Sequence, residues 1–237
     1  MGRLDSRAVL VAGGAGNVGE GIVRALLHDG AQVVVPARGE EKLARLRALL
    51  EEPPRLLTMA GDVADPEGVL LVRDAVAARL PRLDAVVVSV GGWWQGERLI
   101  DVPLETWERV LASNLTSHLV IARAFLPLLL AARHGSYVMI GGSAGLQPVS
   151  GASLACIASA GQIMLARMLM EESKGSGVRV NELMIGTPVV TRGNPKGKPE
   201  WLTADDVGRY VAWLVSDEAS MVSGQVLPLA ERPTAAS

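Results

Sequence analysis

The chain has 237 residues, of which 49% are apolar and 20% charged, with a formal net charge of −2. This balance gives no reason to expect a nucleic-acid or anionic-membrane partner, and the single cysteine, Cys156, excludes an internal disulfide framework. The apolar run near the N-terminus is soon closed by glycines and is too short for a signal peptide or a membrane span. We therefore expect a soluble cytoplasmic protein.

Strand-like and helix-like segments alternate along the chain. Short apolar runs without polar alternation are typical of strands buried on both faces of a parallel sheet. Such runs lie at residues 8–12, 32–35, 55–59, 85–90, 137–140, 179–184 and 225–229. Helical patterns lie between them, at residues 19–28, 40–50, 66–80, 106–132, 153–172 and 203–215.

This alternation predicts an α/β fold, a Rossmann-type doubly wound parallel sheet of about seven strands with helices on both faces. Asp65 and Pro66 resemble an N-cap followed by proline at the first helical position. Because no linker or repeat is evident, residues 1–237 are assigned to a single domain. Within it we expect a short substrate loop at 187–203 and a disordered tail at 231–237.

Three glycines, Gly13, Gly16 and Gly19, separate the first expected strand from the first expected helix. Glycine allows a sharp turn and the close approach of a pyrophosphate, and the helix N-terminus offers free amides. Any tight strand–helix turn also needs some glycine, so the motif alone does not distinguish a dinucleotide site from an ordinary turn. Its position before an amphipathic helix favours a dinucleotide site.

The second expected strand is followed by Ala37 and Arg38. An acidic residue at this point would hold the ribose hydroxyls of NAD, whereas a guanidinium pairs with a 2′-phosphate. We therefore expect NADP(H) rather than NAD(H). The alternative is that Arg38 is a solvated side chain at the start of a helix.

These segments resemble, in order, the landmarks of the short-chain dehydrogenase/reductase family, from about Ser6 to Leu229. The glycine turn resembles the family's TGxxxGxG, GDV precedes the third helix, LASNLTSHLVIARAFLP resembles the central helix, GVRVNELMIGTP resembles IRVNxxxPG, and SGQVLPL resembles the last strand. The resemblance implies a cofactor site formed by Gly13, Gly16, Asn17, Val18, Gly19, Arg38, Asp62, Val63, Ser89, Gly91 and Thr187.

The family's catalytic serine, tyrosine and lysine have no counterparts here. Alignment on SYVMIGGSAG and on LARML places Gly142 at the serine, Ala155 at the tyrosine and Ser159 at the lysine. Neither of the two tyrosines in the chain is followed by lysine four residues later. The family's reaction needs a phenol whose pKa is lowered by the lysine and oxidised nicotinamide, and loss of a general acid costs about 10²–10⁴-fold in rate.

Asn114 is the one member of the family's catalytic tetrad that remains, and Ser143 is a second candidate catalytic residue. Asn114 could equally be retained for structure, since the family uses it at a helix kink. Neither serine nor asparagine has an evident base, and the scattered histidines show no metal-ligand spacing. His118, one turn after Asn114, is expected to face a subunit interface.

Trp93 and Trp94 follow the fourth expected strand, at the sheet edge where ligands bind in open α/β folds. They are candidates for a substrate pocket, where they would stack on a planar ligand, or they cover the core. Lys196 and Lys198 offer charge for an acidic ligand or are simply solvated.

Helices 106–132 and 153–172 have more than one apolar face. The resemblance implies that they form the contact of a homodimer or homotetramer. The other expected partner is a small molecule or a dinucleotide.

The favoured interpretation is an NADP(H)-binding protein with little or no ordinary carbonyl reductase activity, a pseudoenzyme or cofactor sensor. One alternative is an active NAD(P)-dependent or non-redox enzyme with a different acid/base group. Another is an oligomeric scaffold whose cleft binds no cofactor.

Overall fold

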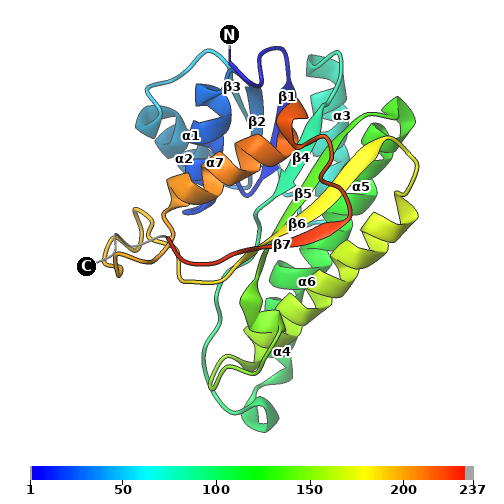
Figure 1. Ribbon diagram of the computed structural model, residues 1–237. Helices are drawn as coiled ribbons and strands as arrows, with labels where there is room; N and C mark the ends of the chain where they lie inside the picture. The colour runs from blue at the N-terminus through cyan, green and yellow to red at the C-terminus, as the bar shows by residue number, and fades with distance from the viewer. Residues whose placement is uncertain (1, 233–237) are drawn as a thin grey trace.

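The computed structural model describes residues 2–232 and contains a seven-stranded sheet in which every neighbouring pair of strands is parallel (Figure 1). The order is β3-β2-β1-β4-β5-β6-β7, so it reverses between β1 and β4. The predicted doubly wound sheet is confirmed. The strands are β1 (Ala8–Ala12), β2 (Gln32–Ala37), β3 (Leu56–Ala60), β4 (Ala85–Val88), β5 (Gly135–Gly142), β6 (Val178–Ile185) and β7 (Gln225–Leu229).

Helices cover both faces of the sheet (Figure 1). Helices α1, α2 and α7 pack on one face, and α3, α5 and α6 pack on the other. The α-helices are α1 (Gly19–His28), α2 (Glu40–Leu49), α3 (Gly68–Arg79), α4 (Leu104–Leu111), α5 (Ser117–Ala132), α6 (Ser153–Glu172) and α7 (Ala204–Val215).

The continuous apolar runs of the sequence are explained by two cores, one on each face of the sheet. In β1, Leu10 packs in the core beneath α3, α5 and α6, whereas Val9 and Val11 pack in the core beneath α1, α2 and α7. Successive side chains of a strand point to opposite faces, so a strand buried on both faces needs an apolar residue at every position.

The predicted helix at 106–132 contains an irregularity that the sequence pattern did not reveal. The structure has α4, then a π-helical segment at Ala112–Thr116, then α5. A π-helical turn inserts an extra residue into the hydrogen-bond ladder, and such turns occur frequently at functional sites. Asn114 lies in the middle of this segment.

The hydrogen bonds confirm the predicted N-cap at Asp65, although the regular part of α3 begins at Gly68. The Asp65 carboxylate accepts from the backbone amides of Glu67 (3.1 Å) and Gly68 (2.6 Å), and its carbonyl oxygen accepts from the amide of Val69 (2.9 Å). Pro66 takes the first position of this turn. The predicted disorder at 231–237 falls largely on residues 233–237, which lie outside the described residues.

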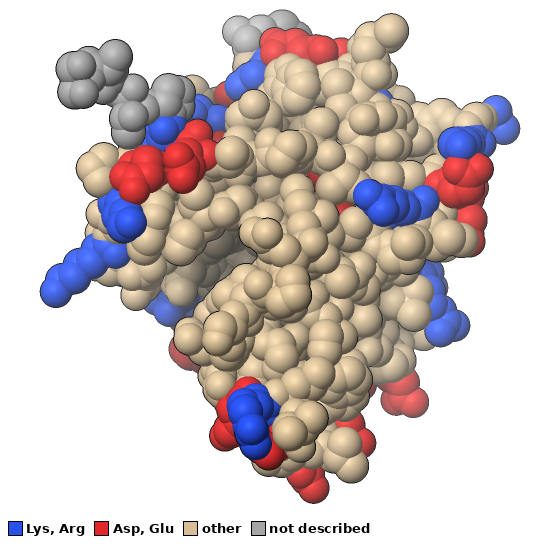
Figure 2. Space-filling model, turned by 60° about the horizontal axis from the view of Figure 1, so that its bottom comes forward, with Lys and Arg blue, Asp and Glu red and all other residues tan. Residues whose placement is uncertain are grey.

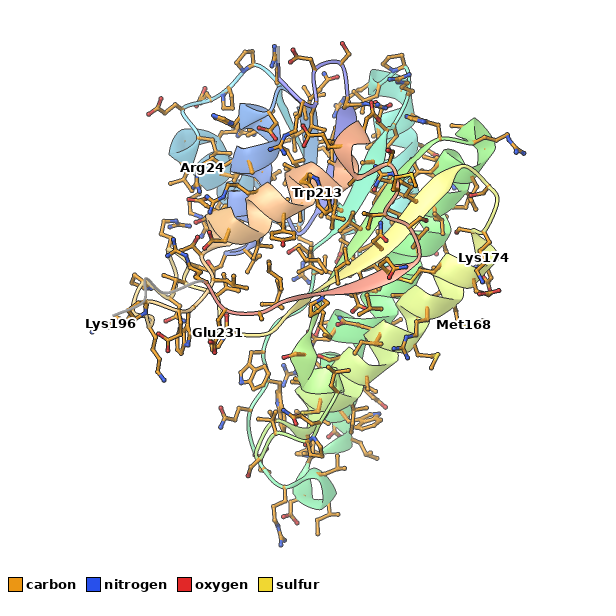
Figure 3. All side chains as sticks on the ribbon, viewed as in Figure 1. Arg24, Met168, Lys174, Lys196, Trp213 and Glu231 are labelled. Carbon is orange, nitrogen blue, oxygen red and sulfur yellow. The ribbon has the colours of Figure 1, made fainter. Side chains whose placement is uncertain are left out.

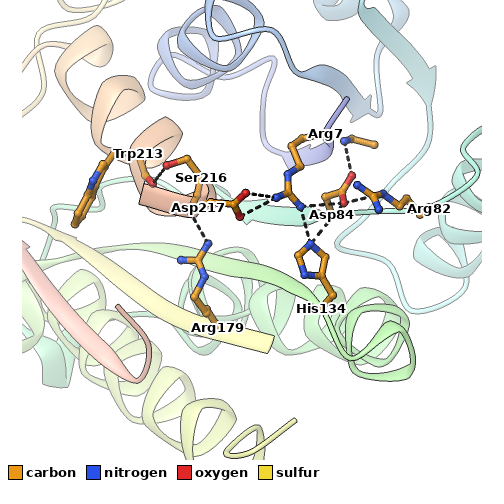
Figure 4. Close-up of polar contacts among 9 residues, drawn as sticks. Arg7, Arg82, Asp84, His134, Arg179, Trp213, Ser216 and Asp217 are labelled. Atoms are coloured by element: carbon orange, nitrogen blue, oxygen red, sulfur yellow. Dashed lines mark hydrogen bonds and ion pairs between the residues drawn. The ribbon is translucent and has the colours of Figure 1, made fainter. Parts of the chain in front are cut away.

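The edge of the sheet where the strands begin is held together by charged groups (Figure 4). The buried carboxylate of Asp84 accepts a 2.8 Å hydrogen bond from the backbone amide of Ala8 and lies 2.9 Å from Arg82 Nε. Arg7 connects Asp84, at 3.5 Å, to Asp217, at 2.6 Å. This network joins segments far apart in the sequence at the edge opposite the strands' carboxyl ends.

Two helical stretches, Leu104–Ala132 and Ser153–Glu172, are long and apolar enough to cross a membrane by length and composition alone. Core helices of soluble proteins pass the same test. Here α5 and α6 pack their apolar faces against the sheet, so we interpret them as core helices of a soluble fold. The cytoplasmic location stays a prediction.

Candidate functional site

A cleft of about 790 Å³ opens where β1, β4, β5 and β6 end. It lies where the strand order reverses, the place where open α/β folds bind ligands. The face of the molecule turned forward in Figure 2 is hollowed, and few charged side chains surround the hollow. The wall is formed by the glycine turn, the segments that follow β4, β5 and β6, and one side of α6.

The glycine turn forms one end of this cleft. Gly13 has φ +85°, and a methyl group placed on it would lie 2.1 Å from the carbonyl oxygen of Ser89, so only glycine fits. Gly13 itself lies behind the wall, while Gly16, Asn17, Val18, Gly19 and Ser89 line the cleft. The backbone amides of Asn17, Val18 and Gly19, at the start of α1, donate no backbone hydrogen bond to any described residue, and these three residues line the cleft. Such amides at a helix N-terminus suit an anion.

Asn114 fixes the wall on the β4 side. Its Oδ1 accepts a 2.6 Å hydrogen bond from the backbone amide of Gly92, and its Nδ2 donates to the carbonyl oxygen of Val110 at 3.0 Å. A methyl group on Gly91, which has φ +99°, would lie 2.3 Å from that Oδ1. The side chain of Asn114 is therefore committed to holding the turn after β4 against the kinked helix.

Arg38, Asp62 and Val63 are the residues expected to bind the adenosine half of a dinucleotide. They lie beside the cleft and are not part of its wall. Arg38 is exposed, and its Nη1 lies 3.9 Å from Asp62 Oδ2. The side chain of Val63 is buried in the core on the α3 side. Sequence reasoning missed Arg45, whose Nη2 donates to the carbonyl oxygen of Ala15 at 3.1 Å and thus reaches the glycine turn from α2.

The two tryptophans do not act as a pair. Trp93 lines the cleft and is 62% exposed. Trp94 does not line it, because its ring folds over Gly96: a methyl group there would lie 2.7 Å from the ring. The prediction that both rings line a substrate pocket is therefore wrong for Trp94.

The substrate loop at 187–203 lies against the glycine turn. Arg192 pairs with Glu20, with Nη2 3.1 Å from Oε2, and a methyl group on Gly193 would lie 2.7 Å from Asn17 Nδ2. Thr187 lines the cleft at the start of this loop. Lys196 projects away from the sheet at the loop's outer end (Figure 3).

Comparison with known proteins agrees with this architecture. The family model described as enoyl-(acyl carrier protein) reductase matches residues 13–230. The cis-4-hydroxycyclohexanecarboxylate dehydrogenase of Sinomonas cyclohexanicum is 30% identical, with 93% of this chain and 94% of the relative covered. The 4-formylbenzenesulfonate dehydrogenase TsaC1/TsaC2 of Comamonas testosteroni is 31% identical, with 94% of this chain and 96% of the relative covered. The chain belongs to the short-chain dehydrogenase/reductase family.

Solved structures share the fold of this short-chain dehydrogenase/reductase. The crystal structure of gox2181 aligns with a TM-score of 0.88 at 25% identity, over 96% of this chain and 95% of that one. A short-chain type dehydrogenase/reductase from Mycobacterium ulcerans aligns with a TM-score of 0.88 at 24% identity, over 96% of this chain and 89% of that one. The family is one of NAD(P)-binding oxidoreductases.

The positions aligned with the family's proton relay lie together in the structure. Gly142, Ala155 and Ser159 all line the cleft, as does Ser143. A methyl group on Gly142 would lie 3.6 Å from Ser159 Oγ, so β5 and α6 approach each other here at ordinary van der Waals distance. This corner of the cleft has the hydroxyl groups of Ser143 and Ser159 and the small apolar side chain of Ala155.

Behind this corner lies a buried polar group that sequence reasoning did not find. Gln162, one turn after Ser159 on α6, lines the cleft and donates from Nε2 to the carbonyl oxygen of Asn114. The same Nε2 lies 3.0 Å from Nε2 of His118, which is fully buried. The prediction that His118 faces a subunit interface is therefore wrong, because its ring points inward beneath α6.

Glu182 on β6 completes the group. Its side chain is fully buried, and neither carboxyl oxygen has a hydrogen-bond partner. A methyl group on Gly141 would lie 2.1 Å from Glu182 Oε1 and 3.6 Å from Gln162 Oε1, so the carboxyl fills the space that a side chain at position 141 would take. The available signal was a lone acid in the apolar run VRVNELMI.

Burial shifts the proton affinities of both groups away from their ordinary values. It raises the pKa of Glu182 to about 7, against a smaller opposing effect of Arg167. It lowers the pKa of His118 to about 4, against a hydrogen bond to the carbonyl oxygen of Val90. In each case desolvation disfavours the charged form.

Proposed function

We propose that the protein is an NADP(H)-binding member of the family with little or no ordinary carbonyl reductase activity, acting as a cofactor sensor. One observation supports the proposed lack of ordinary carbonyl reductase activity. Among the described residues that line the cleft, none has a carboxyl, amine, guanidinium, imidazole, phenol or thiol group. A reduced carbonyl needs a proton at its oxygen, and serine hydroxyls with no adjacent base are poor donors at neutral pH.

The proposed binding of NADP(H) rests on the glycine turn. Its backbone amides and the start of α1 suit a pyrophosphate. Arg38 and Arg45 lie on the side where the adenosine half would extend, and their guanidinium groups suit a 2′-phosphate. These residues support NADP(H) over NAD(H).

Cofactor titration followed by a turnover assay tests the proposal. We expect NADPH to bind in the micromolar range and to be consumed on a panel of aldehydes and ketones at least about 10²-fold more slowly than expected for a family member with an intact relay. Rapid turnover that disappears in Ser143→Ala would instead establish an active enzyme with another acid. If neither NADPH nor NADH binds, the remaining alternative is an oligomeric scaffold whose cleft binds no cofactor.

A restored relay provides the complementary test. Gly142 has φ −129°, and the nearest atom to a methyl group there is Ser159 Oγ at 3.6 Å, so serine fits at this position. We expect the triple variant Gly142→Ser, Ala155→Tyr, Ser159→Lys to reduce carbonyls faster than the parent protein. The matched control replaces Ala155 with phenylalanine, which fills the same space without the hydroxyl, and should stay inactive.

We also propose that the protein assembles as a dimer through α5 and α6. The outer side of these helices exposes apolar side chains, Leu119, Met164 and Met168, the last of which is seen in Figure 3. Apolar groups spaced along neighbouring helices favour burial against a second copy. Met164→Glu together with Met168→Glu should convert the protein to a monomer in light scattering, and an unchanged mass would refute this contact.

A further inference from the structure

The buried Glu182 lies close enough to the cleft to influence what binds there. Its Oε1 occupies the side-chain space of Gly141, and Gly141 and Gln162 are both part of the cleft wall. No hydrogen bond or ion pair neutralises its two carboxyl oxygens within the described part of the chain. An uncompensated carboxylate in a low-dielectric wall acts strongly on a charge placed in the cleft.

The layout of the site determines which part of a dinucleotide would meet this wall. With a pyrophosphate at Gly16–Gly19, the half that carries the 2′-phosphate would extend toward Arg38. The other half would then extend along the cleft toward the corner formed by Gly141 and Gly142, which line it. That half ends in the nicotinamide ring, which carries a positive charge when oxidised and none when reduced.

We propose that Glu182 determines specificity for the redox state of the bound cofactor: its ionised carboxylate favours the cationic, oxidised nicotinamide over the neutral, reduced one. This inference rests on the proposed dinucleotide binding and deepens it. It gives a cofactor sensor a physical means of distinguishing NADP⁺ from NADPH without chemistry, because a ligand that interacts differently with two protonation states shifts their balance.

Among the described titratable groups on this side of the sheet, Glu182 is the one whose charge changes near neutral pH. On the same side of the sheet, α6 contributes Arg167, whose charge partly opposes the rise in the pKa of Glu182. Helix α5 contributes His118, whose pKa of about 4 keeps it neutral above pH 6. β5 contributes Tyr137, whose pKa burial raises far above its usual range, and β7 has no charged residue. With a pKa of about 7, Glu182 is mostly neutral at pH 6 and mostly ionised at pH 8.

Affinity measurements for NADP⁺ and NADPH between pH 6 and pH 8 test the inference. In the parent protein the ratio Kd(NADPH)/Kd(NADP⁺) should rise about fivefold to tenfold over this range, because one unit of pKa shift on binding equals a tenfold change in affinity. The 2′-phosphate is common to both forms, so its titration cancels in the ratio.

Two variants that each replace a glutamate by glutamine test whether the carboxyl group of Glu182 causes this rise in the ratio. Glu182→Gln keeps the size and polarity of the side chain but cannot ionise, so the ratio should become independent of pH. Glu171→Gln removes an exposed carboxylate from the outer side of α6 and should leave the rise intact. A rise that survives in Glu182→Gln, or a flat ratio in the parent protein, would overturn the inference.

A measurement on the parent protein alone covers the case in which Glu182→Gln fails to fold. Calorimetric titration at pH 7 in two buffers of different ionisation enthalpy should show that NADP⁺ binding releases more protons than NADPH binding. Equal proton release by both would refute the inference while leaving the proposed function intact. Absence of binding by either form would instead refute the proposed function and the inference with it.

Discussion

The carbonyl oxygen of Asn114, in the π-helical segment between α4 and α5, accepts a hydrogen bond from the side-chain amide of Gln162 on α6. Nε2 of His118 lies 3.0 Å from that amide nitrogen and 3.3 Å from the carbonyl oxygen of Val90, whereas its Nδ1 has no partner among the described residues. Two helices on the same face of the sheet are thus joined by one amide directly behind the cleft.

Removal of that amide should destabilise the fold. Gln162→Met keeps the length of the side chain but removes the side-chain donor to the buried carbonyl of Asn114 and leaves the His118 ring with the carbonyl of Val90 alone. An unsatisfied buried polar group costs about 1–3 kcal/mol, so the free energy of unfolding should fall by that amount. Denaturant titration measures it. The control Gln147→Met, at an exposed position, should change stability by less than about 0.5 kcal/mol.

The stability of the protein should depend on the protonation of Glu182. Its pKa is about 7 in the folded state against an ordinary value of 4.5, so the folded state holds the proton more tightly. The contribution of Glu182 to the free energy of unfolding is fully present below about pH 4.5, declines as the pH rises and is lost above about pH 7. The advantage of Glu182→Gln over the parent protein should therefore grow by about 2–3 kcal/mol from pH 5 to pH 8. An advantage that shrinks with pH in denaturant titrations would contradict the burial of this carboxyl.

The charged network at the beginning of the strands should be required for stability but not for binding. Asp84 is buried and accepts from the backbone of Ala8, while Arg7 and Arg82 lie around it. Asp84→Asn leaves Arg82 without its countercharge and Arg7 with Asp217 alone, and it should cost about 2–4 kcal/mol in thermal or denaturant unfolding. Asp74→Asn, an exposed control on α3, should be nearly neutral. Loss of dinucleotide affinity at a temperature where Asp84→Asn stays folded would be unexpected.

Cofactor preference should depend on Arg38. Arg38→Asp replaces a guanidinium by a carboxylate beside Asp62, so it should lower the affinity for NADPH by about tenfold or more and change that for NADH much less. Fluorescence titration with both cofactors gives the two dissociation constants. Arg98→Asp, at an equally exposed position away from the glycine turn, serves as the control. Equal losses for both cofactors would refute the role of Arg38.

Most of the fold could be predicted from the sequence because nearly every strand is buried on both faces. The bounds of β1, α1, α6 and β7 agree with the apolar runs and helical patterns to the residue. The π-helical segment could not be predicted, since residues 106–132 form one continuous helical pattern. Residues of the glycine turn and the three positions aligned with the relay line the same cleft, and their assignment to a cofactor and a relay stays a prediction.

The polar group behind the cleft was beyond sequence reasoning for a different reason. His118, Gln162 and Glu182 come from α5, α6 and β6, and they meet only after the sheet has formed. Each taken alone has an ordinary interpretation as a surface or interface residue. The lone acid in β6 was the visible anomaly, because a buried strand seldom contains an ionisable residue without a function or a partner.

Trp93 gives the molecule a built-in optical reporter. Of the five tryptophans, it is the one that lines the cleft, at the end of β4 and largely open to water. A nicotinamide ring entering the corner would displace water from its indole and change its emission. Reduced nicotinamide also absorbs light where tryptophan emits, so energy transfer would distinguish the two redox forms of the cofactor without any label. Trp93→Phe would separate this signal from that of the other four rings.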